Sequence, residues 1–224
     1  MKLIETHCHT RESSSCGQVP AERVVQIYMQ AGYDGLVITD HFSRYNSERF
    51  PIGSGQELSF QEQVTRLFKG YNIAKKVAGE QISVLPGMEI RIDSDANDYL
   101  VYGMTEEQLG AHPNIFEWGI KKFSEYSRNH NLLLVQAHPF RNNMRIVNPE
   151  LIDMIEVYNG NPRQESRNEI ARHMAELNNL PGSAGSDFHR EGDEAVGGVL
   201  LPRAPENIQD FIVMMRENPL LVTK

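Results

Sequence analysis

The sequence predicts an α/β fold: a barrel of seven or eight βα units in a single domain over residues 1–224. Length is the first indication, because α/β barrels of up to about 250 residues form one domain. The second is the alternation of short apolar segments with amphipathic helical patterns, which is typical of βα units and a parallel sheet. The third is the position of the ionisable ligand-type residues, which gather where these segments end.

Each predicted strand is short, apolar or β-branched, and bounded by Gly, Pro, Asn or Asp. In chain order the strands are Lys2–Thr6, Leu36–Thr39, Ile82–Leu85, Tyr99–Tyr102, Leu132–Gln136, Met154–Val157, Ser183–Gly185 and Val199–Leu201. So many βα units in one chain favour a closed barrel over an open sheet.

The predicted helices share apolar residues at a spacing of three to four, which places one apolar stripe on each helix. They are Ala21–Ala31, Gln61–Ala78, Ile115–Arg128, Pro162–Leu177 and Pro205–Arg216. Pro162 and Pro205 suit the first turn, where a missing N–H costs nothing. Segment Ser43–Ser59 is expected to be a long loop and is the candidate lid over one end of the barrel.

Composition narrows the class of protein. The chain has 22 basic and 30 acidic residues, a formal net charge of −8, and 40% hydrophobic residues. This excludes disorder as the main state and argues against an extended nucleic-acid surface, which needs basic side chains. No run approaches the roughly 20 apolar residues of a membrane span, and the first ten residues lack a signal peptide's apolar region. We therefore expect a cytoplasmic protein without a membrane partner.

Histidine and carboxylate residues flank nearly every predicted strand, mostly at its C-terminal end, where βα barrels build their active sites. His7 and His9 lie on one side of an extended segment, because side chains alternate, and two imidazoles on one side are a natural start for a metal site. The other candidates are Asp40, His41, Glu89, Asp98, His138, Asp187 and His189. This set exceeds the needs of one tetrahedral zinc, so two or three divalent ions are expected, and such sites usually perform hydrolysis, often at phosphorus.

Several residues have a plain structural interpretation. Asp40 could cap a loop, and a lone His such as His138 is often a core-edge residue. Cys8 should point away from its histidine neighbours and into the core. His112, His130 and His173 lie in helical or loop segments and are expected to be surface residues.

An ordered set of motifs covers nearly the whole chain. It comprises His7-Cys8-His9-Thr10 followed by Ser13 and Gly17, Thr39-Asp40-His41, Gly87-Met88-Glu89, Ala137-His138-Pro139-Phe140 and Gly185-Ser186-Asp187-Phe188-His189. With these motifs the chain resembles the polymerase and histidinol phosphatase (PHP) domain family. The resemblance implies a distorted (βα)7 barrel with zinc, manganese or iron ions at the C-terminal ends of the strands. It also implies phosphoester hydrolysis.

Carried over by residue, the resemblance implies that His7, His9, Glu89 and Asp187 hold one metal. Glu89 would also bridge to a second metal held by His138, and His41 and His189 would hold a third. Two positions depart from the family pattern. Cys16 stands where the family often has Asp or His, and a thiolate favours a softer metal. Asp98 is the best substitute for a usual His, with Tyr99 as the other option.

The resulting hypothesis is that a hydroxide bridging two metals attacks phosphorus in line. Arg141 or Arg11 would clamp the phosphoryl group, with Arg44 and Arg190 as weaker candidates. Asp40 or a metal-bound water would donate a proton to the leaving oxygen. The substrate would be a small phosphorylated metabolite or a nucleotide.

Three alternatives remain at this point. The chain could be specifically a histidinol-phosphate phosphatase, or a hydrolase of C–N or C–O bonds. It could also be a non-catalytic metal-binding module on the same fold.

Overall fold

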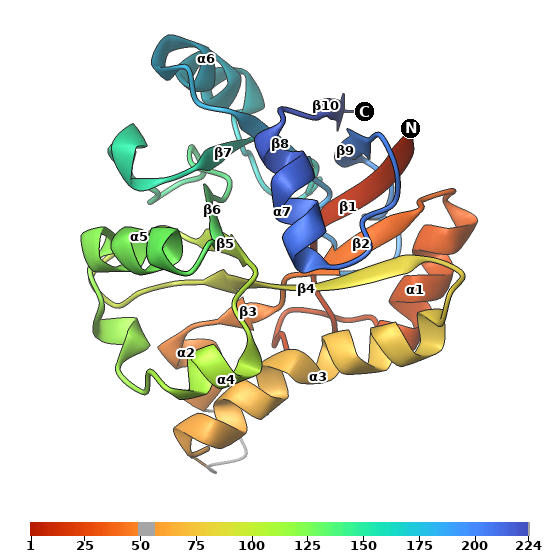
Figure 1. Ribbon diagram of the computed structural model, residues 1–224, viewed down its shortest axis with the longest axis horizontal. Helices are drawn as coiled ribbons and strands as arrows, with labels where there is room; N and C mark the ends of the chain where they lie inside the picture. Colours follow the sequence, from red (N-terminus) through yellow and green to blue (C-terminus); the bar gives the residue numbers. More distant parts are fainter. Residues whose placement is uncertain (49–56, 224) are drawn as a thin grey trace.

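The computed structural model describes residues 1–48 and 57–223 as a nearly closed α/β barrel (Figure 1). Its sheet has the strand order β10-β9-β1-β2-β4-β5-β6-β7-β8, with β3 paired to β4. The strands are β1 Lys2–Cys8, β2 Gly35–Ile38, β3 His41–Phe42, β4 Ser83–Ile90, β5 Tyr99–Tyr102, β6 Leu133–Gln136, β7 Met154–Asn159, β8 Gly182–Gly185, β9 Gly197–Leu201 and β10 Leu220–Thr223.

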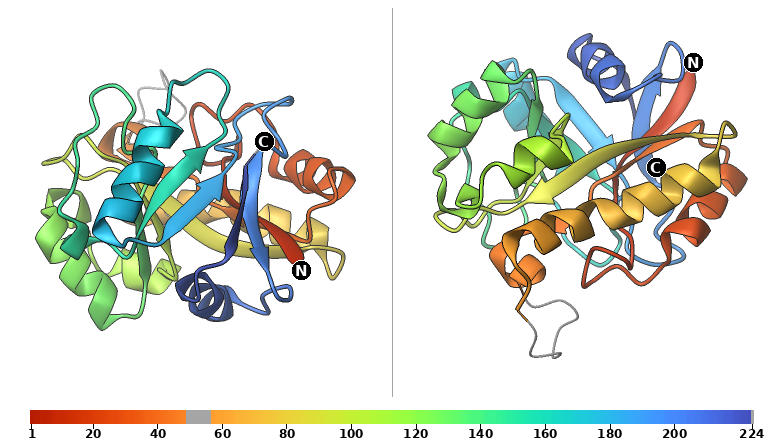
Figure 2. Two further views of the ribbon diagram at one scale, coloured as in Figure 1. Left: turned by 90° about the horizontal axis from the view of Figure 1, so that it is seen from above. Right: turned by 60° about the horizontal axis from the view of Figure 1, so that its bottom comes forward.

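Most helices cover the outside of the sheet, whereas the last one lies across one end of the barrel. In chain order the helices are α1 Ala21–Gln30, α2 Arg44–Glu48, α3 Phe60–Ala78, α4 Glu106–Gly110, η1 Ile115–Glu117, α5 Ile120–Asn129, η2 Pro149–Leu151, α6 Asn168–Asn178 and α7 Ile208–Arg216. Figure 2 shows α1 and α3 side by side along one flank of the barrel. Among the described residues, none of the helices combines the length and apolarity needed to cross a bilayer.

The prediction of a parallel sheet is wrong at β5 and at β9, which is antiparallel to β1. Strands β1, β2 and β4 run parallel, as do β6, β7 and β8, but β5 is antiparallel to both β4 and β6. The connection 91–98 contains no helix and is too short for a parallel crossover, which needs a dozen or more residues. As a result, Asp98 at the beginning of β5 lies at the same end of the barrel as Glu89 near the end of β4.

The seam between β1 and β8 closes the barrel without a regular ladder of backbone hydrogen bonds among the described residues. Thr6 Oγ1 donates to the carbonyl of Ala184 at 2.8 Å, and His9 N donates to the carbonyl of Phe188 at 3.0 Å. Gly185 makes the close approach possible, since a Cβ there would lie 2.6 Å from the Cβ of His7.

Three predicted helices differ from the structure. Helix α7 begins at Ile208, after a cap by Asn207, so Pro205 lies before the helix and not in its first turn. The segment 115–128 divides into η1 and α5, because Trp118 and Gly119 adopt extended backbone angles. Helix α6 begins at Asn168 rather than at Pro162, and Arg167 directly before it has left-handed backbone angles, with φ of 49°, which a helix through this position would not allow. The predicted loop Ser43–Ser59 contains α2 at its beginning, and residues 49–56 lie outside the described part of the chain.

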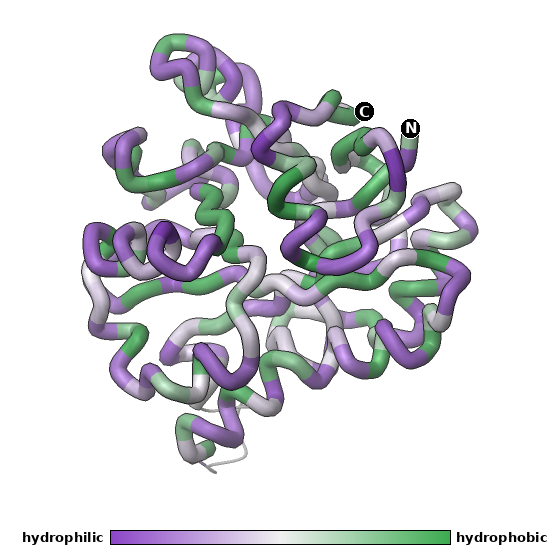
Figure 3. The backbone as a smooth tube through the Cα atoms, viewed as in Figure 1, coloured by the Kyte–Doolittle hydropathy of each residue, from purple (hydrophilic) through white to green (hydrophobic). Residues whose placement is uncertain are grey.

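Apolar residues fill both the barrel interior and the layer beneath the helices. Figure 3 shows the hydrophobic stretches mainly along the strands, and alternating with hydrophilic ones along the helices. Inside, Val37, Leu85 and Leu133 pack with Phe211 of α7. Phe211 also contacts Tyr102, at the end of β5 opposite to Asp98, with ring centroids 5.3 Å apart. Helix α7 therefore closes one end of the barrel and leaves the other end for the ionisable residues.

Candidate metal centre

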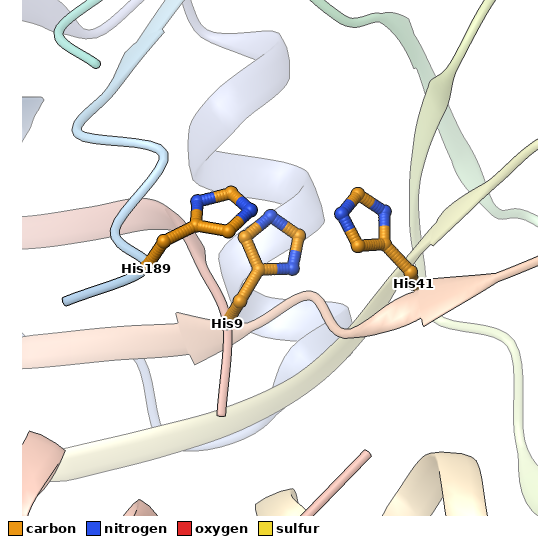
Figure 4. Close-up of side chains that lie close together, drawn as sticks. All are labelled: His9, His41 and His189. Atoms are coloured by element: carbon orange, nitrogen blue, oxygen red, sulfur yellow. The ribbon is translucent and has the colours of Figure 1, made fainter. Parts of the chain in front are cut away.

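The strand ends bring the predicted ligand residues into one cluster. β1 supplies His7 and, one residue beyond its end, His9; β3 supplies His41 and β4 supplies Glu89. The remaining members follow β6 and β8: His138, Asp187 and His189. Figure 4 shows the rings of His9, His41 and His189 gathered together from three separate segments. The ring centroids of His9 lie 4.3 Å from those of both His41 and His189.

Four buried atoms at the centre of the cluster have no hydrogen bond of normal geometry among the described residues: Nε2 of His7, Nε2 of His9, Oε2 of Glu89 and Oδ1 of Asp187. His41 Nδ1 also lies 2.9 Å from Glu89 Oε2. The four atoms converge on one another. Glu89 Oε2 lies 3.3 Å from Nε2 of both histidines, and Asp187 Oδ1 lies 3.4 Å from His7 Nε2 and 3.2 Å from His9 Nε2. Buried polar atoms are rarely left unpaired, so this convergence fits a site for a cation.

The spacing of these four atoms has the size of a metal coordination shell. Zinc binds imidazole nitrogen and carboxylate oxygen at about 2.0–2.2 Å, so tetrahedral ligands stand roughly 3.3–3.6 Å apart. The distances of 3.2–3.4 Å between the imidazole nitrogens and the carboxylate oxygens agree with this value or fall just short of it. The residues present therefore fit one divalent ion held by His7, His9, Glu89 and Asp187.

Further ligand groups surround this centre. His138 Nε2 lies 2.9 Å from Glu89 Oε1 and 4.0 Å from Asp98 Oδ2, so Glu89 can bridge two ions. A third group combines His9 with His41 and His189. Asp98 is also held by Arg91 through two hydrogen bonds of 2.7 and 2.6 Å, which compete with a metal for its oxygens.

Cys16 lies beside the third group and lines the same recess as His41. Burial alone would raise the pKa of its thiol, but His41 and His189 outweigh this effect and lower the pKa to about 5. The residue as a whole is exposed, so solvent weakens this influence. The direction still favours the thiolate, which is the form that binds metals.

The electrostatics of the cluster favour ligands in a metal-binding state. Burial would raise the carboxyl pKa values, but His41 and His7 hold the pKa of Glu89 well below its usual range. His7 and the other nearby cations do the same for the pKa of Asp187. Burial lowers the pKa of His7, yet Asp187, Glu156 and Glu89 raise it well above its ordinary value, so His7 must release a proton when it binds a metal.

Two of these residues have an unusual backbone conformation. His138 has φ +26° and Asp187 has φ +51°, in the left-handed region that residues other than glycine rarely adopt. Such conformations persist only where the surroundings enforce them, and they concentrate at functional sites. The carbonyl of Asp187 accepts a hydrogen bond from His189 Nδ1 at 2.8 Å, which holds that ring in place.

Asp40 lies beneath His9 rather than on the cleft surface. It is fully buried, and its carboxylate accepts hydrogen bonds from Thr10 N, Thr10 Oγ1 and Ser14 Oγ at 2.6–2.7 Å. Ser14 Oγ in turn accepts from His41 N at 2.9 Å and lies 3.3 Å from His9 Nδ1. The structure therefore gives Asp40 contacts that orient two histidines, whereas we expected it to face the leaving group.

The cleft above the cluster consists of two adjoining recesses of about 180 and 340 Å³ that share His41, Arg91 and Asp98. Arg141 lines the larger one and donates from Nη2 to Asp187 and to Asn159 at 2.5 and 2.6 Å. Among the described residues that line the cleft, the arginines are Arg91 and Arg141. The exposed Arg11 does not belong to this set.

The weaker arginine candidates also lie away from the cleft lining. Arg44 pairs with Asp93 at 2.8 Å, and Arg190 Nε lies 4.0 Å from Asp193.

Sequence reasoning missed several residues that support the ligands. Arg91 was not among the candidates. Glu5 follows Leu3-Ile4 in β1 and Glu156 lies between Ile155 and Val157 in β7, and both carboxylates are buried. Glu156 Oε1 lies 2.9 Å from His7 Nδ1, and Glu5 Oε1 accepts from His7 N at 2.9 Å. A carboxylate within a predicted buried strand was the available signal, because such a residue needs a partner inside the protein.

The family of the protein is shown by a match to a known domain. The family model of the PHP domain matches residues 5–209. The chain belongs to the PHP domain family. The match covers most of the chain, including each of the ligand groups described above. The barrel fold expected from the resemblance and the presence of a His, Asp and Glu cluster are confirmed. A search of curated proteins found no match.

Solved structures share the fold at low identity. PsfC from Pseudomonas syringae is 16% identical, with a TM-score of 0.71 over 100% of this chain and 91% of that one. A two-domain protein from Bacteroides vulgatus is 14% identical, with a TM-score of 0.63 over 99% of this chain and 64% of that one. It is described as containing a predicted PHP-like metal-dependent phosphoesterase. Endonuclease Q, solved with a 27-mer duplex, is 10% identical, with a TM-score of 0.60 over 99% of this chain and 58% of that one.

Proposed function

We propose that this PHP-family protein hydrolyses phosphoesters of small phosphorylated metabolites or nucleotides with the help of two or three divalent metal ions. The observation that carries the proposal is a set of four buried ligand-type atoms whose nitrogen–oxygen distances are 3.2–3.4 Å, beside a cleft that Arg91 and Arg141 line. Zinc, manganese and iron all accept such nitrogen and oxygen ligands. The bound ions would supply Lewis acidity and activate water at neutral pH.

The protein residues have distinct roles in this proposal. His7, His9, Glu89 and Asp187 hold the first ion, Glu89 and His138 a second, and His41 and His189 a third, with Cys16 and Asp98 as further candidate ligands. Arg141 and Arg91 face the cleft and bind the phosphoryl oxygens, because a guanidinium presents a planar fork of donors. The two recesses match a small molecule better than a duplex.

The test is metal analysis followed by a substrate panel. The protein is stripped with a chelator and reloaded separately with zinc, manganese or iron. Turnover is then measured on a generic phosphomonoester, histidinol phosphate, nucleotides, dinucleotides, an oligonucleotide and a lactone. We expect phosphoester turnover that returns with metal. A protein that holds two or more ions and cleaves no phosphoester would contradict the proposal.

Matched variants separate the cluster from the rest of the surface. His7→Ala and Asp187→Ala should abolish turnover and leave the protein folded. His173→Ala is the control, because its side chain is 71% exposed on α6. The panel also separates the alternatives. A preference for histidinol phosphate identifies a biosynthetic phosphatase, a preference for the oligonucleotide identifies a nuclease, and a preference for the lactone identifies a C–O hydrolase. Metal binding without turnover on every substrate identifies a binding module.

A further inference from the structure

Glu156 is a buried carboxylate to which the proposed reaction assigns no role. It lies in β7 between Ile155 and Val157, and it is 1% exposed. Its two oxygens have different partners. Oε1 lies 2.9 Å from Nδ1 of His7, whereas Oε2 accepts hydrogen bonds from the backbone N of His138 at 2.8 Å and from Nδ2 of Asn159 at 3.0 Å. One side chain therefore contacts two ligand residues from different strands.

The contact with His7 determines which ring nitrogen is free. An ionised carboxylate only accepts hydrogen bonds, so Nδ1 of His7 must carry the proton that is shared with Oε1. The lone pair of the neutral ring is then on Nε2. That atom is one of the buried atoms without a partner, and it lies 3.3 Å from Glu89 and 3.4 Å from Asp187. Glu156 thus selects the tautomer that can bind a metal at the centre of the cluster.

The contact with His138 acts on the backbone. His138 has a φ of +26°, a conformation that its surroundings must enforce. The hydrogen bond from its N–H to Oε2 is such a constraint, and it aims the imidazole back toward Glu89. Asn159, the third partner of Glu156, also donates to Oδ2 of Asp187 at 3.3 Å. Glu156 contacts His7 and His138 directly, and it is linked to Asp187 through Asn159. His7, His138 and Asp187 form one of the candidate metal groups.

We propose that Glu156 is a positioning residue of the metal centre, which keeps a proton on Nδ1 of His7, so that Nε2 is the atom that faces the ion, and fixes the backbone of His138. The inference rests on the metal centre of the proposed function but not on its reaction. It assigns Glu156 no contact with substrate. The protein gains a preorganised ligand set, because His7 releases only its Nε2 proton and neither histidine needs to rotate when the metal binds.

The glutamine variant Glu156→Gln tests the inference, because its shape is the same and its hydrogen bonding is not. Its single oxygen cannot serve both sides. Facing His138 and Asn159, it places the amide NH₂ against His7 Nδ1 and forces the proton to Nε2. Facing His7, it places the NH₂ against the N–H of His138. Either arrangement damages one ligand, so we expect the zinc affinity to fall about 10- to 100-fold.

Zinc affinity is measured by competition with a chromophoric chelator, which requires no substrate. Glu169→Gln is the control, since that side chain on α6 is 84% exposed, and its affinity should equal that of the wild type. The aspartate variant Glu156→Asp keeps the acceptor-only chemistry on a shorter side chain, so it should lose less affinity than the glutamine variant. Equal affinities of the wild type and Glu156→Gln would overturn the inference.

A measurement on the wild-type protein keeps the inference falsifiable if the variants fail to fold. Long-range proton–nitrogen correlation spectra of the zinc-loaded protein report which nitrogen of His7 carries the proton. We expect a proton on Nδ1 and the metal on Nε2. The reverse pattern would overturn the role of Glu156 whether or not the protein hydrolyses phosphoesters. Conversely, the expected spectrum without turnover on any phosphoester would refute the proposed function alone.

Discussion

Replacing Glu5 with alanine should destabilise the fold at the seam that closes the barrel. Glu5 is fully buried, and its Oε1 accepts hydrogen bonds at 2.9 Å from three backbone N–H groups, those of Thr6, His7 and Ser186. Its Oε2 accepts from the hydroxyl of Tyr28 at 2.9 Å. The register of β1 against β2 shifts between Glu5 and Cys8, so the carboxylate serves the N–H groups of Thr6 and His7 within this irregular stretch.

The magnitude follows from these donors. A buried N–H that loses its partner costs about 1–3 kcal/mol, so the three backbone groups together cost about 3–9 kcal/mol. Removing the carboxylate also removes the cost of burying it, which offsets part of this loss. We therefore expect Glu5→Ala to lower the free energy of unfolding by about 3 kcal/mol, a large part of the 5–15 kcal/mol of a typical domain. Glu5→Gln keeps the triple acceptor and should lose only about 1 kcal/mol.

Urea unfolding of the metal-free protein measures both variants without the contribution of bound ions. Hydrogen exchange adds a local test, because the amides of Thr6, His7 and Ser186 should lose protection in the alanine variant before the rest of the barrel does. A loss below about 1 kcal/mol in Glu5→Ala, with those amides still protected, would refute this account of the seam.

Three further predictions concern the cluster. Ser14→Ala should weaken zinc binding about tenfold, because His9 Nδ1 and His41 N both lose the hydroxyl of Ser14 as a partner. Competition with a chelator measures the affinity, and an unchanged value would contradict the prediction. Arg141→Lys should raise the KM for a phosphomonoester roughly tenfold, because the planar fork is lost, whereas an unaltered KM would exclude Arg141 from substrate binding. The nearby carboxylates raise the pKa of His7 despite its burial, so the metal-free fold should lose stability as pH rises through that pKa, whereas metal binding should become tighter. Thermal unfolding at several pH values, with and without metal, checks both signs. The same pH dependence of the unfolding temperature with and without metal would contradict this prediction.

The sequence was a good guide to the ligands because each follows or begins a strand. The motif His7-x-His9 and the carboxylates at Glu89 and Asp187 have the side-chain chemistry of ligands, and strand ends meet at one edge of a barrel. The structure places them as expected, and Cys16 and Asp98 lie beside the cluster. Metal binding by any of these residues is a proposal. The directions of β5 and β9 were missed, since periodicity identifies a strand but not its orientation.

The supporting residues were harder to predict because their partners are distant in sequence. Glu156 meets His7 across 149 positions, and Glu5 meets Ser186 across 181. Spacing along the chain carries no information about such pairs. The only local signal was a carboxylate in an apolar strand, which indicates that a partner exists but does not say which residue it is.

Gly185 also limits which substitutions the metal centre can accept. Its missing Cβ lets β8 approach His7 so closely that alanine would place a carbon 2.6 Å from the Cβ of His7. Relief to 3.4 Å, where ordinary van der Waals contact begins, would move the two strands apart by about 0.8 Å, the difference of the two values. Metal–ligand distances tolerate only about ±0.2 Å. The absence of a side chain at Gly185 therefore determines how far His7 lies from Asp187, and with it the size of the metal site.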